Sequence, residues 1–221
     1  MTEQNKKVYI LRLLTEIVFI GALGYLFLNG KYQLWFIVFA AGAAASVFSS
    51  RFFCGWICPM ITLFRPVNLL FSRLKIKRFN IDTSRFIFIR YIMLAVFIIS
   101  MIITRKLEIE VPILSVLIAL SIFTVLVFQE SFWHNIVCPF GTALSLTAVK
   151  AGAAIVIDEN LCLSCGICQK ACPADSIDTL DSKKRQIRKA DCLVCYTCAL
   201  KCPAGAIAYK QENIFRHSSS D

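Results

Sequence analysis

The chain has 221 residues, of which 57% are hydrophobic and only 17% charged, and its formal net charge is +10. This balance excludes an ordinary soluble domain, in which about a quarter of the residues are charged. The positive charge does not call for nucleic acid as a partner, because most basic residues flank long apolar runs. Taken in chain order, these runs and the eleven cysteines carry the functional signal.

Long apolar runs dominate the first 150 residues. Four of them predict membrane-spanning helices, at Val8–Leu28, Leu34–Ser49, Phe86–Thr104 and Val111–Phe128. The first run is too long for the core of a signal peptide and no small-residue cleavage site follows it, so we expect an uncleaved anchor. A buried helical bundle is the alternative. Residues 1–150 are therefore expected to form a four-helix membrane domain.

The distribution of basic residues predicts the orientation of this domain. Four spans place both termini on one side of the membrane. Only Lys31, Arg105 and Lys106 lie on the opposite side. The side of the termini carries Lys6, Lys7, Arg12, Arg51, Arg65, Arg73, Lys75, Lys77, Arg78, Arg85, Arg90 and Lys150. The positive-inside rule therefore predicts a multi-pass protein of the cell inner (cytoplasmic) membrane with both termini in the cytoplasm.

An internal repeat with an offset of 80 residues follows the second and fourth runs. Residues 51–60 read RFFCGWICPM, and residues 131–140 read SFWHNIVCPF. Because two spans separate the copies, the pattern predicts two parallel repeats related by an axis along the membrane normal. Such an axis would bring the loops 54–59 and 134–139 together at the cytoplasmic face.

These two loops supply four candidate metal ligands, Cys54, Cys58, His134 and Cys138. Three cysteines and one histidine could hold a third iron–sulfur cluster at the membrane interface, since histidine replaces cysteine in some such sites. The same set suits zinc. Alternatively, the cysteines pack as small apolar residues and the prolines redirect helices. His134 could instead be an ordinary hydrogen-bonding residue.

Glu16 is an acidic residue inside the first run. It lies one helical turn after Arg12, so the two could form an ion pair at the helix end. Ionisable groups within spans are also functional candidates, and this carboxylate could accept protons from a quinol.

Eight cysteines between residues 151 and 214 form two copies of Cys-x2-Cys-x2-Cys-x3-Cys-Pro. This is the bacterial ferredoxin spacing, and it predicts an α+β domain with two [4Fe–4S] clusters, while residues 215–221 form a tail. The fourth cysteine of each motif ligates the other cluster. One cluster is thus assigned to Cys162, Cys165, Cys168 and Cys202, and the other to Cys192, Cys195, Cys198 and Cys172. Zinc or disulfides are the alternative, and thiolates kept for clusters favour a reducing compartment.

The segment around Cys54 and Cys58, the second Cys-Pro at Cys138 and the terminal ferredoxin motifs together resemble the NapH-type membrane ferredoxins. These are quinol dehydrogenase membrane subunits within a wider 4Fe-4S polyferredoxin family. The resemblance covers residues 8 to 210 and implies quinol oxidation, electron relay to partners or metal reduction. The family has two Cys-x3-Cys-Pro motifs, and the sequence departs from this where His134 replaces a cysteine.

The sequence therefore predicts a membrane-bound iron–sulfur electron-transfer subunit of an oxidoreductase complex of quinol dehydrogenase type. It would relay electrons between the quinone pool, or a membrane redox partner, and partner proteins on the cytoplasmic side. One alternative is a copper or iron reductase of oxidase-assembly type. Another is a non-catalytic membrane anchor that wires a larger redox enzyme.

Overall fold

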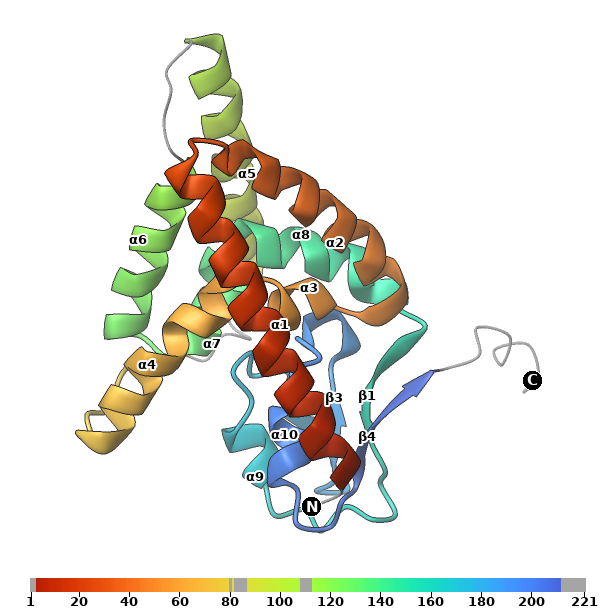
Figure 1. Ribbon diagram of the computed structural model, residues 1–221. Coiled ribbons are helices and arrows are strands. Elements are labelled where there is room, and N and C mark those ends of the chain that lie inside the picture. The colour runs from red at the N-terminus through yellow and green to blue at the C-terminus, as the bar shows by residue number, and fades with distance from the viewer. Residues whose placement is uncertain (1–2, 80, 82–86, 108–112, 212–221) are drawn as a thin grey trace, which may run out of the picture.

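The computed structural model describes residues 3–79, 81, 87–107 and 113–211. A helical part formed by the first 150 residues stands above a small α+β part, and the N-terminal end of α1 reaches down beside the latter (Figure 1). The predicted tail 215–221 lies outside the described residues, as do the predicted run starts Phe86 and Val111.

The helical part contains two successive sets of elements. The first set is α1 (Glu3–Leu28), η1 (Tyr32–Leu34), α2 (Trp35–Ser49), α3 (Phe52–Trp56) and α4 (Pro59–Arg73). The second set is α5 (Ile87–Lys106), α6 (Ile113–Val127), α7 (Glu130–Phe132), the π-helical turn η2 (Trp133–Val137), α8 (Pro139–Thr147) and η3 (Ala148–Lys150). A helix thus occurs at each of the four apolar runs.

Only two of these helices are long and apolar enough to cross a membrane. They are Asn5–Leu28 and Ile87–Lys106, and in the most apolar stretch of each only 17% and 6% of the residues are buried inside the protein. The helices α2 and α6 have 15 residues each, which corresponds to about 22 Å against a hydrocarbon core of about 30 Å. The prediction of four transmembrane helices is therefore not confirmed. The second predicted run was itself short, and α2 ends with it at Ser49, before Ser50 with its φ of 54°. Helix α6 ends at Val127, before Phe128 pairs with Phe79.

The α+β part consists of two antiparallel strand pairs and two short helices. Strand β1 (Ala153–Ile157) pairs with β4 (Ile207–Gln211), and β2 (Ile177–Thr179) pairs with β3 (Arg185–Ile187). Each cysteine motif contributes one helix, α9 (Ile167–Lys170) or α10 (Thr197–Lys201), and η4 (Lys189–Asp191) precedes the second motif. The predicted ferredoxin-like α+β architecture is present, with buried Ile155, Ile177, Ile187 and Ile207 among its core residues.

The two parts share a packed interface centred on α3. Phe53 and Leu144 of the helical part lie in one apolar core with Leu193 of the second cysteine motif. The Trp56 indole donates to the Val194 carbonyl at 3.0 Å. A Cβ on Gly55 would lie 1.9 Å from the Leu193 carbonyl oxygen, so only glycine permits this approach. The second cysteine motif therefore rests directly on the first Cys-Pro loop.

The predicted sequence repeat has a structural counterpart at both Cys-Pro loops. Cys58 and Cys138 have extended backbones and cap helices whose first residue is proline. Their backbone N–H groups donate to the carbonyls of Phe53 and Trp133, each at 2.9 Å. The following helices differ, because α8 is largely buried while α4 projects from the body (Figure 1).

Candidate iron–sulfur sites

The ferredoxin-like part contains two cavities, each lined by four cysteines. Cavity A is lined by Cys162, Cys165, Cys168 and Cys202. Cavity B is lined by Cys172, Cys192, Cys195 and Cys198. In each cavity, three cysteines come from one motif and the fourth from the other. The structure thus brings together the two sets of cysteines that the spacing rule assigned to separate clusters.

The backbone of the two motifs repeats with an offset of 30 residues. Left-handed φ values occur at Ser164 and Gly166 of the first motif, and at Val194 and Tyr196 of the second. Val194 is a marked exception, because β-branched residues rarely adopt positive φ. Two left-handed residues in each Cys-x2-Cys-x2-Cys segment curl the chain around its cavity, which accounts for the convergence of three nearby cysteines.

Both cavities have the donors that an iron–sulfur cluster requires; three of the four cysteines at cavity B are buried, whereas Cys165 at cavity A is exposed. Their remaining walls are mainly apolar, with Ile155, Ile177 and Ile187 at cavity B, and Ile157 and Ile207 at cavity A. Burial raises the pKa of Cys172, Cys198 and Cys192 above the usual thiol value. Thiols in such surroundings are stabilised as thiolates by a bound cationic centre. Four thiols around each cavity therefore fit a [4Fe–4S] group.

A third group of cysteines, called here the three-thiol site, is formed by Cys54, Cys58 and Cys138. Cys54 and Cys138 are buried. Burial raises the pKa of Cys138 to about 12, and the nearby Cys54 raises it further. Burial also raises the pKa of Cys58, with added contributions from Cys54 and Cys138. Cys58 packs against the core that contains Cys54 and against the core that contains Cys138, so the two Cys-Pro loops bring the three cysteines into one region.

The three-thiol site adjoins cavity B. Cys54 and Cys58 belong to the same apolar core as Cys195 and Cys172, which line that cavity. Because Cys54 follows Arg51 by one turn and Arg51 N–H donates to the Cys192 carbonyl at 3.2 Å, the chain itself fixes this proximity. The molecule thus places three thiol-rich positions in the order three-thiol site, cavity B, cavity A.

His134, the fourth candidate ligand of the predicted interfacial site, has other contacts. Its Nε2 lies 3.4 Å from Glu130 Oε1, and its ring packs edge-on against Phe64 with centroids 5.7 Å apart. Its carbonyl accepts a hydrogen bond from Arg51 Nη2 at 3.0 Å. The described contacts therefore bring the three cysteines together but place the imidazole against Glu130.

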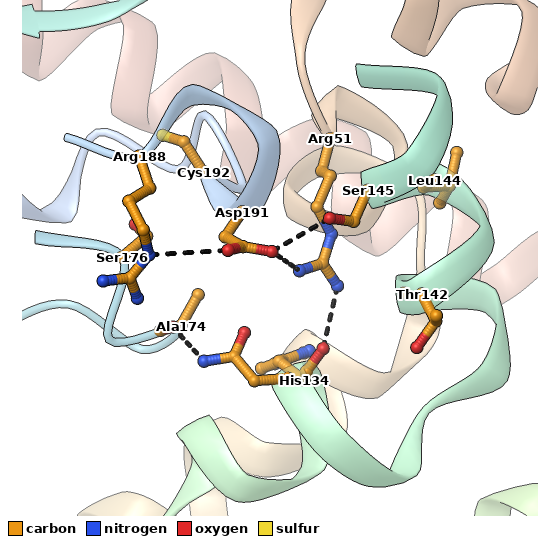
Figure 2. Close-up of polar contacts among 12 residues, drawn as sticks. Arg51, His134, Thr142, Leu144, Ser145, Ala174, Ser176, Arg188, Asp191 and Cys192 are labelled. Atoms are coloured by element: carbon orange, nitrogen blue, oxygen red, sulfur yellow. Dashed lines mark hydrogen bonds and ion pairs between the residues drawn. The ribbon is translucent and has the colours of Figure 1, made fainter. Parts of the chain in front are cut away.

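Arg51 is the centre of a buried polar network between the two parts of the molecule (Figure 2). Its side chain is completely buried, and its Nη1 lies 3.9 Å from Asp191 Oδ1. The same oxygen accepts hydrogen bonds from Ser145 at 3.0 Å and from Arg90 at 3.2 Å. Burial by itself would raise the pKa of Asp191, but the positive charges of Arg90 and Arg51 hold this pKa below its usual value. An ionised carboxylate thus joins η4 to α5 and α8.

The guanidinium of Arg51 also lies close to the thiols. It opposes the rise in thiol pKa at Cys54, Cys58 and Cys138, and likewise at Cys192 of cavity B. Within the described part of the chain, its Nε and Nη1 lack a hydrogen-bond acceptor, although Nη1 faces the Asp191 carboxylate at 3.9 Å. A buried cationic donor without an acceptor is costly, so these atoms are suited to a further anionic group at the three-thiol site.

Arg12 and Glu16 form a second buried link. The Arg12 guanidinium donates to the Gly55 carbonyl at 2.7 Å and to the Cys195 carbonyl at 2.6 Å. Glu16 pairs with Arg12 at 2.8 Å, as the spacing suggested, and also with Arg65 of α4 at 2.8 Å. Helix α1 is thereby attached to the Cys-Pro loop and to the ligand loop of cavity B.

Sequence reasoning treated Arg12, Arg51 and Arg90 as membrane-flanking charges. The structure shows all three buried and hydrogen-bonded within the protein. The signal that could have identified Arg51 is its position three residues before Cys54, and Asp191 directly precedes Cys192. Within the described ranges, no three His, Cys, Asp or Glu side chains converge to hold a single metal ion.

Comparison with known families supports this assignment of the cysteine-rich segments. A family described as a 4Fe-4S binding domain matches residues 33–78 and 111–152, which contain both Cys-Pro loops. A 4Fe-4S dicluster domain family matches residues 137–207. The chain therefore carries ferredoxin-type 4Fe–4S domains, and the first of these matches extends the iron–sulfur signal to the three-thiol site.

Three relatives align with most of the chain. Uncharacterized protein MJ0749 of Methanocaldococcus jannaschii is 29% identical over 73% of this chain and 65% of its own length. Uncharacterized protein MJ0750 of the same organism is 24% identical over 72% of this chain and 71% of its own length. "Putative electron transport protein YccM" of Escherichia coli is 25% identical over 77% of this chain and 54% of its own length.

The aligned part thus spans just under two thirds of the first relative and about half of YccM. No solved structure matches the chain. Together, the two families and the distant homology to YccM support an iron–sulfur electron-transfer protein. A NapH-type assignment is not confirmed by these matches.

Proposed function

We propose that the protein is a membrane-bound electron-transfer subunit. It relays electrons between the quinone pool, or a redox partner in the membrane, and partner proteins on the cytoplasmic side. The observation that supports this proposal most directly is the contact between the three-thiol site and cavity B, since Cys54 and Cys195 share one apolar core. Three adjoining thiol-rich positions suit a relay better than a single structural metal site.

The proposed cofactors are two [4Fe–4S] clusters and a third iron–sulfur cluster. Cys162, Cys165, Cys168 and Cys202 hold the first at cavity A, and Cys192, Cys195, Cys198 and Cys172 hold the second at cavity B. Cys54, Cys58 and Cys138 hold the third. When bound, such clusters supply reversible one-electron chemistry. The chain contributes thiolates, apolar walls and the Arg51 charge, which are the features that set a cluster's potential.

The membrane part of the proposal rests on exposed apolar surface. Helix α5 buries only Arg90 and exposes Phe88, Ile92, Ile99 and many further apolar side chains. Such a surface is far larger than a soluble monomer usually exposes. We propose that α1 and α5 span the inner membrane together with the shorter α2 and α6, and that both termini and the ferredoxin-like part are cytoplasmic.

A small apolar pocket of ≈ 20 Å³ beside the three-thiol site marks the proposed quinone position, which a ring enters as the aromatic side chains around it move apart. It is lined by Trp35, Phe36, Phe39, Phe53, Cys58, Pro59, Met60, Leu114 and Phe140. An aromatic lining offers stacking faces to a flat ring, and Cys58 belongs to both the cavity and the three-thiol site. The buried Glu16, which contacts Thr62 and Arg65 of α4, is the nearest candidate for handling protons on this side of α1.

Anaerobic reconstitution into lipid nanodiscs tests this function. We expect a short-chain quinol to reduce the bound iron–sulfur centres, with loss of visible absorbance and appearance of the EPR signals of reduced clusters. Replacing Phe39 or Phe140 by alanine should slow quinol reduction while leaving reduction by dithionite unchanged. Centres that dithionite reduces but no quinol reduces, even with membrane partners present, would remove the quinone role.

A metal reductase is the second candidate, favoured by the presence of three thiols without a fourth cysteine. Soft thiolates suit Cu(I), so the three-thiol site could present a copper ion to electrons stored at cavity B. This function predicts that Cu(II) oxidises the reduced centres and that Cys54→Ala abolishes the reaction. Oxidation unaffected by that change would eliminate it.

A further inference from the structure

A broad groove separates α4 from the ferredoxin-like part, and Figure 1 shows α4 projecting on the same side as α9. The empty space of this groove is ≈ 2220 Å³. One wall comes from α4 and the segment after it, and the other from the ends of α9 and α10. Residues 129–131 and the N-terminal half of α1 complete it. The positive-inside pattern accounts for basic residues on this side of the molecule, but it accounts neither for a groove between α4 and the ferredoxin-like part nor for the lysines of α9 and α10.

The groove is strongly basic. Its lining includes Arg12, Arg65, Lys75, Lys77, Arg78, Lys170 and Lys201, and its one carboxylate is Glu130. Arg12 and Arg65 share the single carboxylate of Glu16, so this trio keeps one net positive charge. The four lysines are exposed and form no ion pair within the described part of the chain. Two of them lie on each wall, so both walls present positive charge to whatever enters.

The floor of the groove is also a wall of cavity B. Cys172 and Pro173 line both the groove and the cavity. A molecule lying in the groove is therefore separated from the contents of cavity B by these two residues. Of the three thiol-rich positions, cavity B is the one whose cysteines include a lining residue of the groove, so this charged surface approaches cavity B.

We propose that this groove, named here the docking groove, binds an electron-carrier protein with an acidic face, which exchanges one electron per encounter with the centre held at cavity B. The inference rests on the proposed function and names the surface that the cytoplasmic partner uses. If the carrier arrives reduced, its redox centre loses one electron and the centre at cavity B gains it. No bond forms or breaks, and the opposite direction has the same balance.

A protein partner fits the groove better than a lipid headgroup does. A headgroup is small, whereas Lys75 and Lys77 lie on one wall and Lys170 and Lys201 on the other. An acidic protein face can contact both walls at once and can bring its redox centre over Cys172. Complementary charge of this kind mainly raises the rate of encounter, and added salt screens it.

The test is stopped-flow mixing of the full chain in nanodiscs of neutral lipid with a dithionite-reduced acidic ferredoxin. Lys170→Glu/Lys201→Glu is compared with Lys183→Glu/Lys210→Glu, which changes the same net charge at exposed positions of the same part outside the groove. We expect the groove variant to react about tenfold slower at low salt, and the control less than about twofold slower. At about 1 M salt, where charges are screened beyond about 3 Å, the difference should vanish.

The outcomes separate the docking groove from the proposed function. If dithionite itself reduces no centre in the wild type, the electron-transfer function and the docking groove both fail. If dithionite reduces all variants equally but the groove variant reacts with ferredoxin as fast as wild type, the docking groove alone is overturned. If the groove variant reacts with ferredoxin at the wild-type rate but binds phosphatidylglycerol vesicles more weakly, the ligand of the groove is an anionic lipid and not a carrier protein. Equal iron content in all variants excludes misfolding.

Discussion

At the scale of single residues, Arg51 connects the two thiol-bearing regions of the molecule. Its guanidinium is fully buried, contacts the His134 carbonyl and Asp191, and lies close to the thiols of both the three-thiol site and cavity B. A Cβ on Gly141 would lie 2.3 Å from its Nη2, so the chain leaves space for it. A fixed positive charge stabilises the reduced, more negative state of a nearby cluster.

Removing this charge should therefore lower a reduction potential. We expect Arg51→Gln to shift the midpoint of the centre at the three-thiol site by about −60 mV, equivalent to about 1.4 kcal/mol for one electron. Arg51→Lys, which keeps the charge, should shift it less. The midpoint is measured by EPR-monitored redox titration, with Arg73→Gln on the exposed end of α4 as the control. An unchanged or higher midpoint would contradict this role.

The contacts of His134 lead to a prediction about the third set of ligands. Because its imidazole lies against Glu130, we expect His134→Gln to retain the iron of the wild-type protein. Cys58→Ser should lose the iron of one cluster, since it removes one of the three thiols proposed to hold it. Iron and acid-labile sulfide per chain distinguish the two variants. Equal losses in both would make His134 a ligand, as the loop repeat alone suggested.

At the scale of elements, the short helix α3 determines how the ferredoxin-like part is seated. Gly55 lies against Leu193, Trp56 donates to Val194, and Arg12 of α1 bridges the Gly55 and Cys195 carbonyls. The first Cys-Pro loop and the second ferredoxin motif thus form one packed unit.

A methyl group at this contact should separate the two parts. We expect Gly55→Ala to cost about 1–3 kcal/mol of stability through overpacking, to slow electron exchange between the three-thiol site and cavity B, and to increase proteolysis near residue 151. Gly21→Ala in α1 is the matched control, because a Cβ there meets no atom within 4 Å. Circular dichroism melting and limited proteolysis provide the readouts. Equal melting temperatures and equal proteolysis of the two variants would contradict the close contact of α3 with the second ferredoxin motif.

Much of this element-scale arrangement could be predicted from the sequence, because short-range spacing determines it. The two ferredoxin motifs predicted the grouping of Cys172 with Cys192, and the 80-residue repeat predicted similar backbones at Cys58 and Cys138. Long-range pairing could not be predicted in the same way. Nothing local to Arg90 indicates that it pairs with Asp191, because that contact depends on how the two parts dock.

At the scale of the whole molecule, the apolar runs predicted where α2 and α6 end, because α2 ends at Ser49 and α6 at Val127, within one residue of the expected ends. The runs did not establish a membrane span in each case, because α2 and α6 have only 15 residues each, whereas α1 and α5 are long enough. The residues after these two helices, Ser50 and Phe128, contact the ferredoxin-like part and Phe79, which apolarity alone does not reveal. The exposed apolar surface lies on the helices, and the basic groove lies beside the ferredoxin-like part.

The central claim is that three thiol-rich positions carry three iron–sulfur centres in one chain. The most direct measurement is iron and acid-labile sulfide per chain after anaerobic purification in mild detergent, for the wild type and for Cys58→Ser/Cys138→Ser. We predict roughly ten to twelve irons in the wild type and about eight in the variant. About eight irons in both would contradict the claim, leaving clusters only at cavities A and B and a purely structural three-thiol site.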